Sequence, residues 1–129
     1  MPPGEALSAA QRARLQQSIV ATEAATGLRI RLHLGPLADG RAGAEALLVA
    51  EGTAAADTVV VAVDPGARAL EIVTGTRAAS QLSDRSCGLA ALAMTSSFTA
   101  GDLVGGLVNG LQVIADHGRR QRVLHLDRA

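Results

Sequence analysis

The run TVVVAVD at positions 58–64 restricts the fold more than any other part of the sequence. Between its first and last residues every side chain is apolar, and no polar residue alternates with them. A strand that is apolar on both faces has to be covered on both faces, as central strands of α/β sheets are. The run therefore predicts the buried central strand of a layered α/β domain.

The segments on either side of this run predict a small mixed sheet. LRIRLHL at 28–34 alternates apolar and polar residues, which is typical of a strand with one face in water. A short helix over roughly 41–51 would join it to the central strand as a parallel crossover. ALEIVTG at 69–75 follows the turn DPGAR and predicts an antiparallel hairpin with the central strand.

Three longer helices complete the predicted elements. Ser8 and Gln11 form a capping box that opens the first helix, and a glycine just after about residue 25 ends it. Ser83 caps the second helix, which we expect to run to about residue 98, and Asp102 begins the last one, which ends near residue 115.

The chain length of 129 residues suits one domain, which we place at residues 7–117. Residues 1–6 are expected to form a disordered lead. Residues 118–129 are expected to form a polar tail, in which RVLHL could add a short strand at a sheet edge.

Composition excludes several classes of protein. The formal net charge is zero and aromatic residues make up 1% of the chain, so we expect no nucleic-acid partner. One cysteine, Cys87, rules out an intrachain disulfide and favours a reducing, cytoplasmic location. The longest apolar stretch, roughly 87–115, is interrupted by Gly101 and Asp102, so no membrane-spanning helix is expected.

Three aspartates are candidates for a cation site. Asp39 and Asp64 follow the carboxyl ends of two parallel strands, and the helix before Asp102 should return the chain to the same sheet edge. Carboxylate oxygens are the ligands that Ca²⁺ and Mg²⁺ prefer. The alternative is structural: Asp39 and Asp102 would cap their helices, and Asp64 would support the turn that follows it.

The segment SFTAGDLVGGLVNGLQVI at 97–114 carries four glycines, Gly101, Gly105, Gly106 and Gly110. It lacks the Lys-Ser/Thr pair of a phosphate-binding loop and reads as a helix, which excludes a nucleotide cradle. Gly101 belongs to the break before the helix. Gly106 and Gly110 lie at one margin of its apolar stripe, which predicts close approach of a neighbouring backbone.

One face of the first predicted strand carries Arg29, Arg31 and His33. Alternation puts these side chains together on the side opposite the apolar residues. They form either a solvated face or a surface for an anion or a protein partner. The strand could also lie at an edge of the sheet, where unpaired backbone invites pairing.

Three further residues have mainly structural interpretations. Arg68 lies at the hairpin and could form an ion pair with Asp64 or Glu71. Asp84 stands in the first turn of its helix, where the helix dipole favours an acid. Cys87 lies on an apolar helix stripe, which indicates a buried packing thiol, because no histidine motif would activate it.

Two segments, RALEIVTGTRAASQLSD and SFTAGDLVGGLVNGLQVI, resemble the TPM domain family. The matching signals are an arginine that opens the strand, a glycine that ends it, LSD close behind, and a phenylalanine followed by Gly-Asp and Gly-Gly pairs. The similarity covers about residues 7–117 and is greatest to a small actinobacterial branch. It implies a three-layer α/β/α sandwich, and it offers Asp84 a second interpretation as a site residue at the opposite sheet edge.

The resemblance leaves two functions open, because a fold does not fix a function. Some relatives are described as acid phosphatases and others bind divalent cations. The first hypothesis is a non-catalytic interaction or regulatory module that binds an unknown protein partner and holds a divalent cation through its aspartates. The second is a metal-assisted phosphatase acting on phosphomonoesters, in which Asp39, Asp64 and Asp102 hold the cation.

Overall fold

The computed structural model describes residues 7–119 and places three strands in one sheet of order β1-β2-β3. β2 (Thr58–Asp64) is central, and its five residues 59–63 are at most 1% exposed. β1 (Arg29–Leu34) pairs with β2 in parallel, and β3 (Ala69–Thr74) pairs with it antiparallel. The buried central strand, the parallel pair and the hairpin are therefore confirmed.

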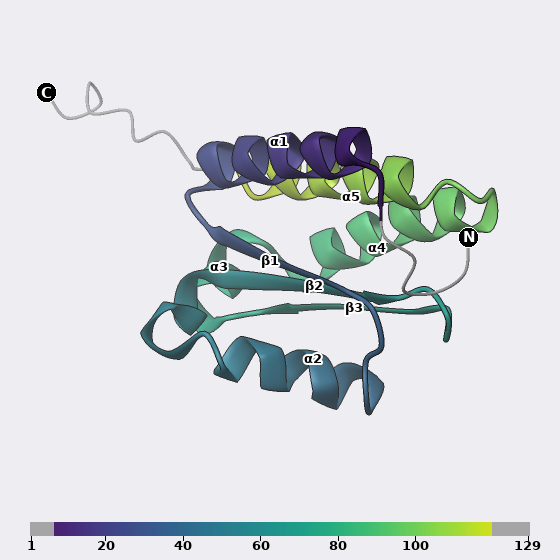
Figure 1. The fold of residues 1–129 in the computed structure, drawn as a ribbon. Helices are drawn as coiled ribbons and strands as arrows, with labels where there is room; N and C mark the ends of the chain where they lie inside the picture. The colour runs from purple at the N-terminus through teal and green to yellow at the C-terminus, as the bar shows by residue number, and fades with distance from the viewer. Residues whose placement is uncertain (1–6, 120–129) are drawn as a thin grey trace, which may run out of the picture.

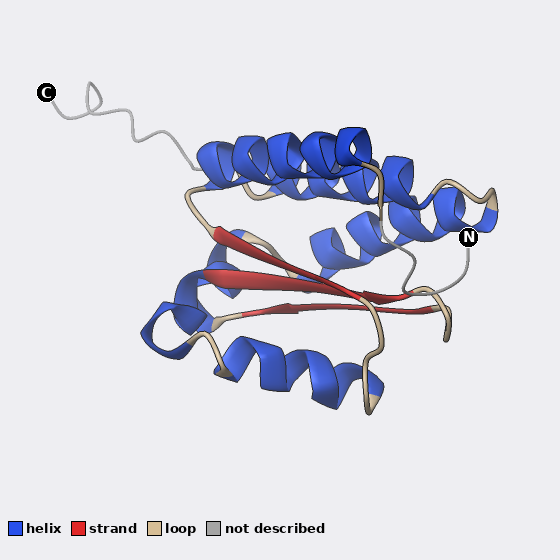
Figure 2. Ribbon diagram, viewed as in Figure 1, coloured by secondary structure: helices blue, strands red, loops and turns tan. Residues whose placement is uncertain are grey.

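Helices cover the two faces of this sheet unequally (Figures 1 and 2). α2 (Gly40–Val49) lies alone on one face, where it packs on β2 and β3. α1 (Ala9–Thr26), α4 (Asp84–Thr99) and α5 (Leu103–His117) lie on the other face. Because α2 packs on β2 and β3, no helix within residues 7–119 lies directly on the same face of β1.

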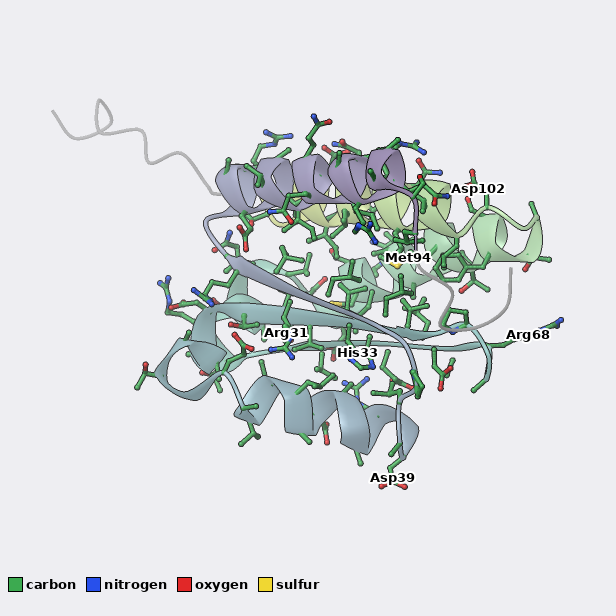
Figure 3. All side chains as sticks on the ribbon, in the orientation of Figure 1. Arg31, His33, Asp39, Arg68, Met94 and Asp102 are labelled. Atoms are coloured by element: carbon green, nitrogen blue, oxygen red, sulfur yellow. The ribbon has the colours of Figure 1, made fainter. Side chains whose placement is uncertain are left out.

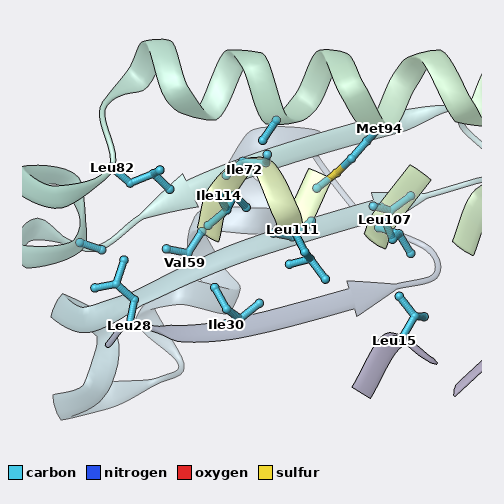
Figure 4. Close-up of a cluster of buried hydrophobic side chains, with 14 of the residues drawn as sticks. Leu15, Leu28, Ile30, Val59, Ile72, Leu82, Met94, Leu107, Leu111 and Ile114 are labelled. Carbon is cyan, nitrogen blue, oxygen red and sulfur yellow. The ribbon is translucent and has the colours of Figure 1, made fainter. Parts of the chain in front are cut away.

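The larger hydrophobic core fills the space between the sheet and the three-helix layer (Figure 4). With one aromatic side chain in the chain, this core is built from aliphatic residues and one methionine. Its most central members are Ile30, Val59, Val61, Ile72, Met94, Leu107, Leu111 and Ile114.

A smaller core lies between the sheet and α2. It consists of Ala44, Val60, Ala62 and Val73, all of them small side chains. Val60 and Ala62 face α2, whereas the residues on either side of them in β2 face the larger core. Because each face of β2 meets a hydrophobic core, all five residues from 59 to 63 are apolar.

The first helix packs mainly along the last one. Thr22 of α1 donates its hydroxyl to the Leu111 carbonyl of α5 at 3.3 Å. At the far end, the Gln81 side-chain amide donates to the carbonyls of both Thr26 and Gly118, so the ends of α1 and α5 are tied together. Two segments that are far apart in the sequence therefore lie side by side (Figure 1).

The caps predicted at Ser8, Gly27 and Ser83 are present. Ser8 and Gln11 exchange side chain–backbone hydrogen bonds of 2.8 and 3.1 Å, and Ser83 accepts from the Ser86 N–H. Gly27 ends α1 with a φ of 73°, in the left-handed region. Each of these signals involves residues within one turn of the helix end, which is why the sequence alone locates them.

Two short helices are absent from the prediction. The 3₁₀ helix η1 (Gly52–Asp57) precedes β2, and α3 (Thr76–Gln81) follows β3. Neither has a capping side chain, and neither is long enough to show an apolar period. The predicted lead at 1–6 and the RVLHL strand lie outside the described residues. Within 7–119, none of the helices combines the length and the apolar character needed to cross a membrane.

Candidate functional site

Asp64 closes the carboxyl end of β2 and holds two loops. Its Oδ2 accepts from the Leu37 N–H at 3.0 Å, in the β1–α2 connection. Its Oδ1 accepts from the Ala67 N–H at 3.2 Å, in the β2–β3 turn. Both carboxylate oxygens therefore serve the backbone, and the loops at this edge of the sheet share one anchor.

Asp39 and Asp102 belong to different layers of the molecule. Asp39 precedes α2 with a φ of 61° and makes no capping hydrogen bond with its side chain, so the expected cap is absent. Asp102 does cap α5, because its Oδ1 accepts from the Gly105 N–H at 2.9 Å. Figure 3 shows Asp102 beside the helices on one side of the sheet and Asp39 beside α2 on the other.

The structure thus does not bring Asp39, Asp64 and Asp102 together, which corrects the expectation of one shared Ca²⁺ or Mg²⁺ site. Among residues 7–119 there is no group of three or more His, Cys, Asp or Glu side chains placed to hold a metal ion. The strand topology predicts which end of the sheet these three residues reach. On which side of the sheet each one lies depends on the face that its helix covers.

The predicted ion pair of Arg68 is not formed within the described residues. Arg68 occupies the left-handed region at φ 55° in the hairpin turn and extends away from the body of the molecule (Figure 3). Glu71 instead lies 3.5 Å from Arg41, because its side chain shares the sheet face that α2 covers. Asp84 is an exposed acid in the first turn of α4, as the dipole argument predicts.

The four glycines of the 97–114 segment have different roles. Gly101 has a φ of 87° in the turn between α4 and α5. A Cβ on Gly105 would overlap the capping carboxylate of Asp102, and one on Gly106 would lie 2.7 Å from the Phe98 ring. A Cβ on Gly110 would overlap Met94.

These contacts partly correct the prediction for the glycine pair. At Gly110 the approaching group is the Met94 side chain and not a backbone. Only Gly106 is close to backbone, because its Cβ would lie 3.0 Å from the Met94 carbonyl oxygen. Glycine at both positions lets α5 approach α4 closely.

A serine–histidine contact joins the start of α4 to the end of α5, and no local sequence pattern predicts it. The Ser86 Oγ lies 3.3 Å from His117 Nδ1 and accepts from the Ser83 hydroxyl at 3.1 Å. Ser86 is 9% exposed.

The neighbouring residue, Cys87, is half-buried. Burial is the largest cause that raises the pKa of its thiol, and the negative charge of Asp84 raises it further, while Arg41 acts in the opposite direction. The thiol is therefore held in its unreactive form.

The uncovered face of β1 carries a basic strip, which we define as Arg29, Arg31 and His33. Arg29 and Arg31 both reach Glu51, at 3.6 and 2.5 Å. Glu51 is 11% exposed, whereas the two arginine side chains are 62% and 42% exposed. His33 Nε2 lies 2.8 Å from the Pro36 carbonyl oxygen. One carboxylate thus faces two guanidinium groups at the strip itself, and Figure 3 shows Arg31 and His33 on the side of the sheet where α2 lies.

The outer edge of β1 is paired with no strand of the part of the chain that the structure describes. Gly35 donates its N–H to Val63 of β2 at 2.9 Å, and backbone groups of a strand alternate in direction. Leu32 and Leu34 therefore turn their N–H and C=O groups away from β2, and no other described strand lies there. The N–H of Ile30 points the same way but donates to the Glu23 carboxylate at 2.8 Å.

Comparisons with known proteins give a fold and a family but no activity. The N-terminal domain of the cg2496 protein from Corynebacterium glutamicum has a TM-score of 0.74 at 17% identity, covering 92% of this chain and 78% of that one. The BA42 protein from the psychrophilic bacterium Bizionia argentinensis has a TM-score of 0.77 at 20% identity, covering 92% and 88%. Such identities show a shared small mixed α/β fold alone. No curated protein matches the chain. A family model described as a domain of unknown function, DUF5130, matches residues 3–115.

Proposed function

The chain belongs to the DUF5130 family, and from that premise we propose that it is a non-catalytic interaction or regulatory module with a TPM-like three-layer α/β/α fold. It binds a protein partner in a reducing compartment such as the cytoplasm. The observation that carries this proposal is the basic strip: the Arg29 and Arg31 side chains stay 62% and 42% exposed although both contact Glu51.

The strip is better suited to binding than to stability. Exposed ion pairs contribute only about 0–1 kcal/mol each, so two arginines on one carboxylate add little to folding. The carboxylates that a metal-assisted reaction would use are engaged elsewhere: Asp64 accepts from two backbone N–H groups and Asp102 caps α5. An interaction role needs only the exposed side chains of the basic strip and no rearrangement of these carboxylates.

The test is capture of partners from an extract of the source cells by the full chain. Arg29→Glu reverses a charge on the strip at a side chain that is 62% exposed. Arg85→Glu is the matched control, because Arg85 is exposed and lies away from the strip. It belongs to α4, which contacts β3, the strand at the other edge of the sheet. We expect at least one protein to be retained by the parent and Arg85→Glu and to be lost with Arg29→Glu.

The competing proposal, from the TPM resemblance, is metal-assisted hydrolysis of phosphomonoesters. It is assayed with p-nitrophenyl phosphate in millimolar Mg²⁺ or Ca²⁺, together with Asp64→Asn and Asp102→Asn. Turnover that needs the cation and falls in either variant, with no strip-dependent partner, would replace the interaction module by an enzyme. No turnover in any variant, with strip-dependent capture, is the outcome that we expect.

A further inference from the structure

We infer that the partner adds an extended segment to the open edge of β1 as a fourth strand, with acidic side chains at every second position over the basic strip. This inference rests on the proposed interaction function and names the chemistry of the partner. The backbone of β1 and its two side-chain faces carry it.

The backbone of β1 offers a short pairing edge. Leu32 and Leu34 direct their N–H and C=O groups outward. A strand added to such an edge supplies a hydrogen-bond acceptor for each N–H and a donor for each C=O. Pairing cannot extend to the start of the strand in the same way, because the Glu23 carboxylate already accepts from the Ile30 N–H. The edge therefore suits a segment of about five residues, since paired positions alternate along a strand.

The two faces of β1 specify the side chains of that segment. An added strand alternates in step with its neighbour, so one set of its side chains lies beside the basic strip and the other set beside Leu32 and Leu34. Acidic residues complement the first set, because Glu51 is the one carboxylate bound to the two arginines. Leu32 and Leu34 are half-buried against the larger core, so apolar residues complement the second set.

Charge distinguishes this occupant from the end of the chain itself. Residues 120–129, RQRVLHLDRA, contain three arginines and one histidine but one aspartate. A basic segment beside the strip would place like charges side by side, which opposes binding. The observations therefore favour an acidic segment of another protein.

The test is a titration of the ¹⁵N-labelled full chain with the peptide acetyl-EVEVEVE-amide, with acetyl-KVKVKVK-amide as the matched control. We expect the acidic peptide to shift the amide signals of β1 and to slow hydrogen exchange at Leu32 and Leu34. Exchange at Arg31 and His33, which face β2, should change little. Arg29→Glu should weaken binding about fivefold or more, and Arg85→Glu less than about twofold.

Several results would overturn the inference. These are equal binding of the lysine peptide, no shift with millimolar acidic peptide, or binding without protection of Leu32 and Leu34. Protection already present in the free chain and lost with Leu124→Pro would show that the chain's own end occupies the edge. Strip-dependent capture of a partner without edge protection would overturn strand addition and leave the interaction module in place.

Discussion

The side chain of Met94 on α4 fills the space in which a Cβ atom on Gly110 of α5 would lie. Met94 is fully buried, so it has no solvent into which it can retreat. The spacing of α4 and α5 is therefore set by a large residue on one helix and the absence of a side chain on the other.

Gly110→Ala should lower the free energy of unfolding by about 1–3 kcal/mol through overpacking, although alanine is the better helix former. Gly88→Ala is the control, because Gly88 is exposed within α4 and a Cβ there would meet nothing within 4 Å. That change should stabilise by about 0.5–1 kcal/mol. Urea unfolding of both variants measures the difference, and equal stabilisation would contradict the packing argument.

A shorter side chain at position 94 should relieve the overpacking that Gly110→Ala causes. Met94→Ala alone is expected to cost about 2–5 kcal/mol because it leaves a cavity. Combined with Gly110→Ala, it should cost clearly less than the sum of the single changes, because the new methyl group then occupies vacated space. Additive single and double variants would show that the two positions do not interact.

Asp102 and Gly105 form a second coupled pair, at the start of α5. Asp102→Ala should cost about 1 kcal/mol through loss of the cap, whereas Asp102→Ser should retain most of the stability. Gly105→Ala should destabilise the parent, because its Cβ would overlap the Asp102 carboxylate, but not the Asp102→Ala variant. Thermal unfolding of the three single variants and the Asp102→Ala/Gly105→Ala double variant tests this.

Asp64 should be more important for stability than an exposed acid. Asp64→Ala removes the acceptors of the Leu37 and Ala67 N–H groups and is expected to cost about 1–3 kcal/mol. Asp64→Asn keeps one acceptor oxygen and should lie between the parent and the alanine variant. Asp116→Ala, at an exposed position on α5, should change stability by less than about 0.5 kcal/mol. Similar effects at 64 and 116 would exclude the loop-anchor role.

The raised pKa of Cys87 predicts how stability depends on pH. Below about pH 9.0, the ordinary value, the thiol is protonated in both folded and unfolded chains and contributes no slope. Above that pH the unfolded chain loses the proton first, so the unfolded state gains and stability falls. Above pH 9.0 the free energy of unfolding of the parent should therefore fall relative to that of Cys87→Ala, which has no thiol to titrate. A difference that stays constant to pH 10.5 would contradict it.

The elements that the sequence predicts well are those with local signals. The run at 58–64 predicts β2, and the caps at Ser8 and Ser83 locate two helix starts within one turn. The short helix α3 escapes prediction because six residues with one buried alanine, Ala78, show no apolar period. It packs against η1 and β3, and these tertiary contacts leave no pattern in the local sequence.

The candidate site is less predictable because it depends on how helices settle on the sheet. Alternation places Arg29, Arg31 and His33 on one face, but their exposure follows from the position of α2 over the other two strands. The same dependence separates Asp39 from Asp102. The partner of Gly110 likewise depends on the register between two helices, which a single helical wheel does not contain.

The pairing of α1 with α5 has a consequence for synthesis of the chain. Thr22 and Leu111, which bond across the two helices, are 89 positions apart. At about 5–20 residues per second, a ribosome makes the second roughly 4–18 s after the first. The last strand, β3, ends at Thr74, so in the final part of that interval all three strands have been made and α5 has not. Until α5 is made, the apolar residues that it covers lack that cover, and exposed apolar surface of this kind favours aggregation.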